Sequence, residues 1–521
     1  MELSGLDITV FIAYCCVIIG LGLYVSRRKK GQEETSSDYF LAGRALPWWA
    51  IGASLIASNI SAEQFIGMSG AGFAVGLGMA SYEWIGALGL LIVAKFFLPI
   101  FIKKKIYTMP QFLEVRFDGR VRTSLAVFWL MVYVFVNLTS VLYLGALVLK
   151  AVLGINLFYA ILGLAMFSAL YSVYGGLKAV AWTDVVQVTF LIFGGFVTTF
   201  LVLREIGAGE GLMAGFNNMV AAAPEKFDMI LDKGHEYYKY LPGIGVLVGG
   251  MWMANLYYFG CNQYIIQRAL AAKNIREAQR GMAFASFLKL LLPLLVVLPG
   301  IAAFVLGADI ERPDDAYPWL LSNYVGVGLK GLVFAALIAA IVSSLSSMTN
   351  SSSTIFTMDL YKTLINKEAS EKILVRTGRI TALVVLAVAV IIAPQLRNLD
   401  QAFQFIQDFT GYVTPGVVAI FLAGLFWKRA TSNAVLVGAI LTIPLSFAFD
   451  LLFPEMAFMD RVGITFLVLC GVIIGISLWE RKGISSKAIP LESSLFHTGH
   501  AFNISSIIVI AILSVIYSLY W

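Results

Sequence analysis

Charged residues are scarce in this 521-residue sequence: Asp, Glu, Lys and Arg make up 13% of it, whereas soluble domains contain about 25%. That scarcity excludes a water-soluble enzyme with an ordinary charged surface. The three histidines lie in loops or at a span edge, and no HExxH, phosphate-binding loop or nucleophile motif accompanies them. The four cysteines lie in apolar stretches without the spacing of a metal site or a disulfide framework. We therefore predict that the protein is not an enzyme.

Long apolar runs dominate the chain. Hydrophobic residues make up 59%, the mean hydropathy is +0.84, and one span needs about 20 apolar residues. We count fourteen such segments, approximately 7–25, 46–71, 79–101, 123–151, 156–174, 182–204, 242–267, 278–306, 328–358, 378–395, 402–427, 431–452, 462–479 and 501–520. The loops between them are too short for a separate soluble domain. The sequence predicts an all-α membrane protein with about 14 transmembrane helices in a lipid bilayer.

Basic residues are unevenly distributed between alternate loops. Of the 37 lysines and arginines, 26 fall in the loops after odd-numbered segments and 9 in the opposite set. Because cytoplasmic loops collect Lys and Arg, both termini are expected to be extracytoplasmic. The net charge of +6 therefore reflects membrane orientation, and we expect no nucleic-acid partner.

Polar residues interrupt the second apolar segment. The stretch 57–64 reads Ala-Ser-Asn-Ile-Ser-Ala-Glu-Gln, which is poor material for a helix facing lipid. It suits a helix break whose freed carbonyls line a cavity. The ninth segment carries Ser343, Ser344, Ser346 and Ser347. Hydroxyls facing unwound carbonyls would supply the oxygen ligands that a hard cation needs.

Several ionisable or amide side chains also lie inside predicted spans, where each is expensive and indicates a functional site. They are Glu83, Asp184, Asn255, Lys289 and Gln407. Glu83 could stabilise a helix N-terminus through the dipole, or it could accept hydrogen bonds from a polar ligand. The ammonium of Lys289 must be paired or bound to oxygens.

Five strings in the same order carry a family resemblance: 57–64, Tyr107–Phe117, Tyr174–Asp184, Asn262–Arg268 and Ile341–Ser344. The chain closely resembles the solute:sodium symporters, and among them the bacterial sodium/galactose branch, over essentially its full length. The resemblance implies a LeuT-type core with broken helices. Five helices in 46–205 and five in 242–427 would form inverted repeats, with an additional helix in 1–30 and three in 431–521. It also implies sodium-coupled import of a monosaccharide, of galactose or glucose type, across a bacterial plasma (inner) membrane by alternating access.

Residue roles follow from the resemblance by position. The sugar would be bound by Asn59, Gln64, Glu83, Asn255, Lys289 and Gln407. The outer gate would be Met68, Tyr82 and Phe403, and the inner gate Tyr258 and Phe259. The co-transported sodium ion would bind Ala57, Ile60, Ala340, Ser343 and Ser344. Some relatives bind a second sodium, for which this chain offers Asp184, Ser346 and Ser347, so we predict two sodium ions per sugar.

Two departures leave the solute open. The galactose branch has a serine where this chain has Gly86, and a tryptophan where it has Phe259. Glucose and galactose differ at one hydroxyl, which only the geometry of the site can discriminate. A sodium symporter for sialic acid, inositol or an amino acid shares the scaffold, and a passive sugar channel is a further alternative. The oligomeric state is not predicted.

Overall fold

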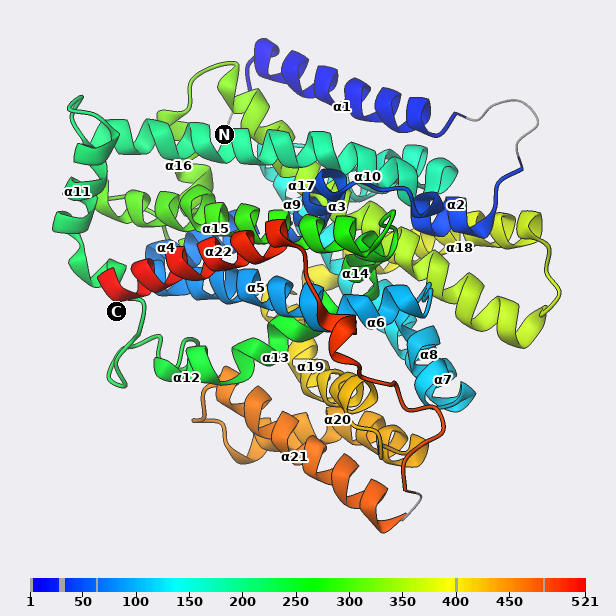
Figure 1. Ribbon diagram of the computed structural model, residues 1–521. Helices are drawn as coiled ribbons and strands as arrows, with labels where there is room; N and C mark the ends of the chain where they lie inside the picture. The colour runs from blue at the N-terminus through cyan, green and yellow to red at the C-terminus, as the bar shows by residue number, and fades with distance from the viewer. Residues whose placement is uncertain (1–2, 28–32, 62–63, 399–401, 481–482) are drawn as a thin grey trace.

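The computed structural model describes residues 3–27, 33–61, 64–398, 402–480 and 483–521, and it describes side chains within those ranges except at 151, 397–398 and 402–409 (Figure 1). Within them the ordered structure is helical, which confirms the predicted fold class. Ten of the described helices are long and apolar enough to cross a membrane. The count of fourteen stays a prediction, as does the division into two repeats and flanking helices.

The first half of the chain begins with a helix along one side of the bundle and continues through interrupted helices. Their bounds are α1 (Gly5–Val25), α2 (Ser36–Leu41), α3 (Trp48–Asn59), η2 (Gln64–Met68), α4 (Ser69–Ala74), α5 (Ser81–Ile92), η4 (Val93–Phe97), α6 (Leu98–Lys103), α7 (Met109–Arg116), α8 (Gly119–Met131), η5 (Val132–Leu138), α9 (Thr139–Leu153) and α10 (Leu157–Ile206). Between this half and the next lie α11 (Leu212–Ala222) and the short turn η6 (Pro224–Phe227).

The second half also consists of long and interrupted helices. Their bounds are α12 (Ile244–Val248), α13 (Gly250–Leu256), η7 (Tyr257–Cys261), α14 (Gln263–Leu270), α15 (Ile275–Val305), η8 (Pro313–Asp315), α16 (Ala316–Tyr324), α17 (Leu329–Ile355), η9 (Phe356–Ile365), α18 (Glu371–Ile392), η10 (Ala393–Asn398) and α19 (Ala402–Phe426). Three more helices follow, α20 (Ser432–Leu452), α21 (Phe458–Trp479) and α22 (His500–Leu519).

The second apolar segment is broken, as predicted. The helix α3 ends at Asn59, Ile60 is extended with φ −80° and ψ 123°, and helical structure resumes in η2 at Gln64. The seventh segment shows a similar interruption, because Asn262 is extended between η7 and α14. Each interruption leaves backbone groups without helical partners inside the bundle. These are the places where carbonyls and side chains can line a site.

The fifth and sixth apolar segments join in α10, which bends sharply at one residue. Gly176 has φ +56° and ψ −152°, a conformation that only glycine adopts without strain. The two predicted spans are therefore two helices that meet at a kink at Gly176.

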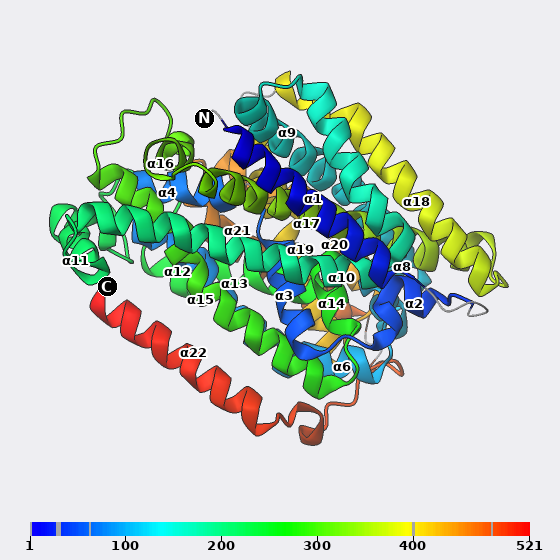
Figure 2. The ribbon, with the colours of Figure 1, turned by 90° about the horizontal axis from the view of Figure 1, so that it is seen from above.

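The serine-rich α17 lies at the centre of the bundle. It packs against α10, α1, α9 and α3, and almost every side chain along it is buried. The neighbouring α15 packs on α3, α4 and α5. Along the top of Figure 1, α1 lies beside α10, whereas α20 and α21 lie at the opposite side (Figures 1 and 2). The polar residues of α17 thus face other helices and not lipid.

Candidate functional site

The break after α3 meets α17 at Ser344. The Ser344 hydroxyl lies 3.4 Å from the carbonyl oxygen of Ser58 and 3.4 Å from that of Ile60. Both predicted carbonyl contributors on the same two helices, Ala57 and Ala340, are fully buried. The structure therefore brings the unwound backbone and a buried hydroxyl together in one oxygen-rich place. Such a set can hold a sodium ion.

The neighbouring Ser343 turns toward a different partner. Its hydroxyl donates to Oδ1 of Asp184, at 2.6 Å, and Asp184 lies on α10. The other carboxylate oxygen of Asp184 accepts from Ser54 at 2.6 Å. Ser343 can still offer its lone pairs to a cation. It thereby connects the α3 break to the Asp184 carboxylate.

An arginine that we did not predict as a site residue lies beside Asp184. The guanidinium of Arg268 is fully buried, 3.7 Å from the Asp184 carboxylate, and it also contacts the hydroxyl of Ser347. Ser347 in turn lies 2.9 Å from the Ser58 hydroxyl. Of the three residues predicted for a second sodium, Asp184 and Ser347 both contact Arg268, so a built-in cation already shares the carboxylate.

The third of those residues, Ser346, has partners of its own. Its hydroxyl donates to the carbonyl of Ser343 at 2.9 Å and accepts from the Tyr171 hydroxyl at 3.3 Å.

The sequence signal that could have pointed to Arg268 is its charge at the end of an apolar span, since intramembrane charges mark functional sites. Ser54 carries no comparable signal, because lone serines are common at helix interfaces, whereas Ser58 belongs to the polar stretch 57–64.

A second group of predicted residues surrounds a buried ion pair. Lys289 on α15 pairs with Glu83 on α5, and both side chains are buried. The Lys289 ammonium also lies over the Phe259 ring, 5.1 Å from its centroid. The predicted need for a partner at Lys289 is confirmed. The pair carries no net charge, yet it presents acceptor and donor atoms beside an aromatic face.

Gly86 lets a third side chain join this pair. A Cβ atom at Gly86 would lie 2.7 Å from Oδ1 of Asn255 and 3.2 Å from the Lys289 ammonium nitrogen. Both distances are shorter than ordinary contacts of about 3.5–4.0 Å. A side chain at this position would therefore displace the ends of the Asn255 and Lys289 side chains from where they lie. The departure seen in the sequence has a structural role.

The inner aromatic residues join α3 to η7 and α14. The amide of Asn59 lies 3.4 Å from the Tyr258 hydroxyl, which accepts from Tyr264 at 2.8 Å. The rings of Tyr258 and Phe259 meet edge to face at 5.1 Å. Gln64, by contrast, accepts locally from the backbone and hydroxyl of Ser61, each at 2.8 Å. Tyr258 therefore faces the α3 break, whereas Phe259 faces Lys289.

The loop between the two halves contacts the C-terminal end of α4. The Lys226 ammonium donates to the Ala74 carbonyl at 2.6 Å and lies 4.4 Å from the centroid of the Phe304 ring. Partial burial lowers the pKa of Lys226. The predicted outer-gate residues Met68 and Tyr82 are half-buried. The side chains of Phe403 and Gln407 lie outside the described part of α19.

The sodium:solute symporter family model matches residues 39–442, most of the chain. The protein belongs to this family. Sodium is therefore co-transported, and the predicted class of sodium-coupled transporter is confirmed.

Two relatives and one solved structure extend the comparison. The chain is 53% identical to a sodium/glucose cotransporter of Vibrio parahaemolyticus, over 100% of this chain and 99% of that protein. It is 37% identical to the mouse sodium/myo-inositol cotransporter 2, over 84% of this chain and 68% of that protein. The solved structure of a Na⁺-coupled sialic acid symporter, in a substrate-bound outward-open state, matches with a TM-score of 0.80. That match covers 91% of this chain and 98% of that one at 23% identity, so it shows the shared LeuT-type fold alone.

Proposed function

We propose that the protein imports a neutral hexose of the glucose or galactose type together with sodium, by alternating access. The observation that carries the proposal is the neutral cluster of Glu83, Lys289 and Asn255 beside the Phe259 ring. Sugar hydroxyls both donate and accept, and a pyranose has an apolar face that suits an aromatic ring. The 53% identity to a sodium/glucose cotransporter over the whole chain supports the same solute class.

The ion pair argues against an anionic solute. A sialic acid or amino-acid carboxylate needs a cation to receive it, and here Lys289 is already neutralised by Glu83. An anion would also meet the Glu83 carboxylate in the same place, which costs free energy in a buried site. A second candidate is myo-inositol, because it too is a neutral ring of hydroxyls and a relative at 37% identity is a sodium/myo-inositol cotransporter.

For sodium, the proposed ligands are the carbonyls of Ala57, Ile60 and Ala340 with the hydroxyls of Ser343 and Ser344. An ion there would hold the end of α3 against α17, because Ser344 already faces the Ile60 carbonyl. Coupling requires sodium to bind one conformational state more tightly than the other. Loss of sodium would release the α3 break, and with it Asn59 and the aromatic residue Tyr258 that it contacts.

The two-sodium stoichiometry is a separate proposal with a specific cost. A second ion between Asp184, Ser346 and Ser347 would share one carboxylate with Arg268. Two cations on one buried carboxylate leave a net positive charge, which burial penalises. Either Arg268 moves when the ion enters, or the protein uses one sodium per sugar. A reversal-potential measurement in vesicles distinguishes the two stoichiometries.

The driving force is sufficient with one ion. A potential of about 100 mV supplies ~2.3 kcal/mol per charge, and a tenfold sodium gradient adds ~1.4 kcal/mol. Together they support a sugar ratio of roughly 500-fold.

The proposed setting is a bacterial plasma membrane, with both termini extracytoplasmic. Residues 46–205 and 242–427 are the proposed inverted repeats.

A competition panel tests the proposed solute. Proteoliposomes with an inward sodium gradient would be given labelled glucose, with unlabelled galactose, myo-inositol, sialic acid or proline as competitors. We expect saturable, sodium-dependent accumulation of glucose that galactose inhibits and that sialic acid and proline do not. Non-saturable flux without sodium would indicate a passive channel, and inhibition by sialic acid alone would overturn the hexose proposal.

A further inference from the structure

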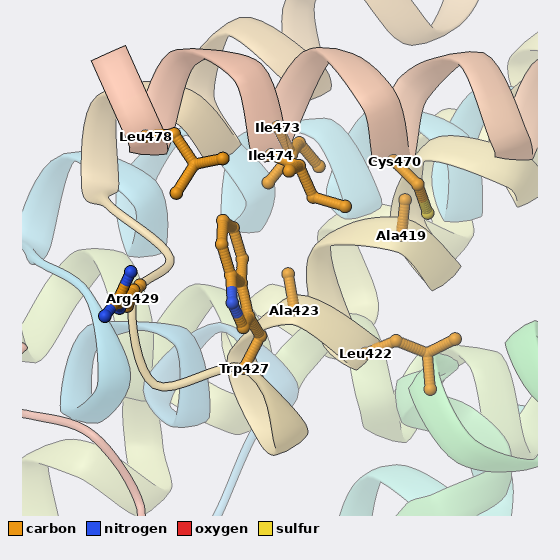
Figure 3. A pocket seen from close by; sticks show the side chains of 9 residues that line it. All are labelled: Ala419, Leu422, Ala423, Trp427, Arg429, Cys470, Ile473, Ile474 and Leu478. Carbon is orange, nitrogen blue, oxygen red and sulfur yellow. The ribbon is translucent and has the colours of Figure 1, made fainter. Parts of the chain in front are cut away.

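An open apolar groove of about 520 Å³ runs between α19 and α21, away from the proposed transport site. Small residues on the two facing helices create it, among them Ala419, Ala423 and Cys470. Figure 3 shows Trp427 standing in the groove, with Leu478 and Arg429 toward one end and Ala419 and Cys470 toward the other. Ile474 and Leu478 are exposed along its open side. Within a bilayer, such a surface meets lipid chains.

The end of the groove that carries Arg429 is rigidly built. The buried side chain of Arg116 donates to three carbonyls around the turn that follows α19: Gly424 at 3.0 Å, Trp427 at 2.8 Å and Ala430 at 3.3 Å. The backbone of Thr431 donates to the Ser477 hydroxyl of α21 at 3.2 Å. The backbone of the turn that carries Trp427 and Arg429 is thus tied to both walls of the groove.

Two basic side chains at this end of the groove are unpaired within the described part of the chain. Lys428 and Arg429 are exposed, and among the described residues neither side chain forms an ion pair. The distribution of basic residues predicts that this turn faces the cytoplasm, where anionic headgroups attract Lys and Arg near the surface. An interfacial tryptophan beside them is typical of the headgroup level.

A second groove provides an internal comparison. It has a volume of about 380 Å³ and is lined by Trp48, Phe284 and Phe502, again with an arginine, Arg280. That arginine lies 3.8 Å from the carboxylate of Glu277 one turn earlier. Both grooves are apolar and both hold a tryptophan and an arginine. They differ in that no carboxylate of the residues that the structure describes pairs with the arginine at the α19–α21 groove.

We propose that the α19–α21 groove binds an anionic phospholipid of the cytoplasmic leaflet. One acyl chain would lie along Ala419, Ala423 and Ile474. Arg429 and Lys428 would bind the phosphate of the headgroup. A guanidinium binds phosphate oxygens through paired hydrogen bonds. A zwitterionic headgroup brings its own cation and so gains less from the two basic residues. The inference does not depend on which solute the protein carries.

Native mass spectrometry of the full-length protein tests the site, with phosphatidylglycerol and phosphatidylcholine as the added lipids. We expect wild type to retain phosphatidylglycerol preferentially and Arg429→Gln to retain it about fivefold less, the factor that corresponds to ~1 kcal/mol per basic residue. Arg280→Gln is the matched control and should retain as much as wild type. Ala423→Phe fills the groove while keeping the charge, and should also lose the lipid.

Position and alternative occupants can be checked with a phosphatidylglycerol that carries a photoreactive acyl chain. Cross-links are expected within 419–427 and 470–478. Three outcomes would overturn the proposal: equal retention of the two lipids, unchanged retention in Arg429→Gln, or cross-links that fall outside 419–427 and 470–478. An unchanged thermal midpoint of the Arg429→Gln variant would show that its loss of lipid is not caused by unfolding. Neither readout depends on sugar uptake, so failure here leaves the proposed function unaffected.

Discussion

Removing one hydroxyl at a time from α17 should separate the proposed sodium site from its surroundings. Ser344 faces the carbonyls of Ser58 and Ile60 at the α3 break, at 3.4 Å each. Ser347 instead contacts Arg268. Ser352, a full turn further on, is buried but donates within its own helix to the Met348 carbonyl at 2.8 Å. The three serine-to-alanine changes are therefore chemically matched but differ in what each hydroxyl touches.

The expected magnitude follows from the loss of one oxygen ligand. A buried polar interaction left unmade costs about 1–3 kcal/mol, which corresponds to a factor of roughly 5–150 in affinity. Ser344→Ala should therefore raise the sodium concentration for half-maximal sugar uptake by about that factor. Ser352→Ala should leave it unchanged. Uptake into proteoliposomes is measured against sodium concentration at constant ionic strength, with protein amount and thermal midpoint checked for each variant.

Ser347→Ala decides between the stoichiometries. If one sodium binds at the α3 break, this variant should keep the wild-type sodium dependence. If a second ion binds beside Asp184, the steepness of the sodium dependence should fall. The site assignment is refuted if Ser344→Ala transports sugar with the sodium dependence of Ser352→Ala.

Three further predictions concern the buried charges and Gly86. Glu83→Gln or Lys289→Met alone leaves an unpaired buried charge, at a cost of about 3–5 kcal/mol. Each single variant should therefore lower the thermal midpoint more than the double variant does, whereas additive effects would show that the pair is not coupled. Gly86→Ala places a methyl 2.7 Å from the Asn255 oxygen and should raise the KM for sugar about 2- to 12-fold, equivalent to one displaced hydrogen bond, with Vmax little changed; an unaltered KM would place the sugar elsewhere. Arg268→Gln leaves the buried Asp184 carboxylate without its cation. The thermal midpoint in sodium minus that in potassium should therefore be larger for this variant than for wild type, and an equal difference would contradict access of sodium to that carboxylate.

Much of the architecture was predictable because it follows from hydropathy and charge. Apolar runs of about 20 residues must form helices in lipid, where every backbone polar group needs an internal partner. The polar stretch around Asn59 predicted the break in α3 for the same reason. The polarity of Glu83, Asn255 and Lys289 inside predicted spans pointed to these residues, and the structure pairs Lys289 with Glu83 and places both Lys289 and Asn255 beside Gly86. Gly86 could be noticed as a departure, but its contact with Asn255 could not.

The linear chain by itself determined that this protein is helical, membrane-spanning and interrupted at Asn59, since each of these depends on local composition. The partners of its buried charges were decided only by tertiary packing. Arg268 and Asp184 are 84 residues apart in the sequence, and the guanidinium approaches that carboxylate because α14, α10 and α17 converge. The hydropathy of a segment indicates that burying a charge there is unfavourable. Which residue compensates that charge depends on where the helices cross.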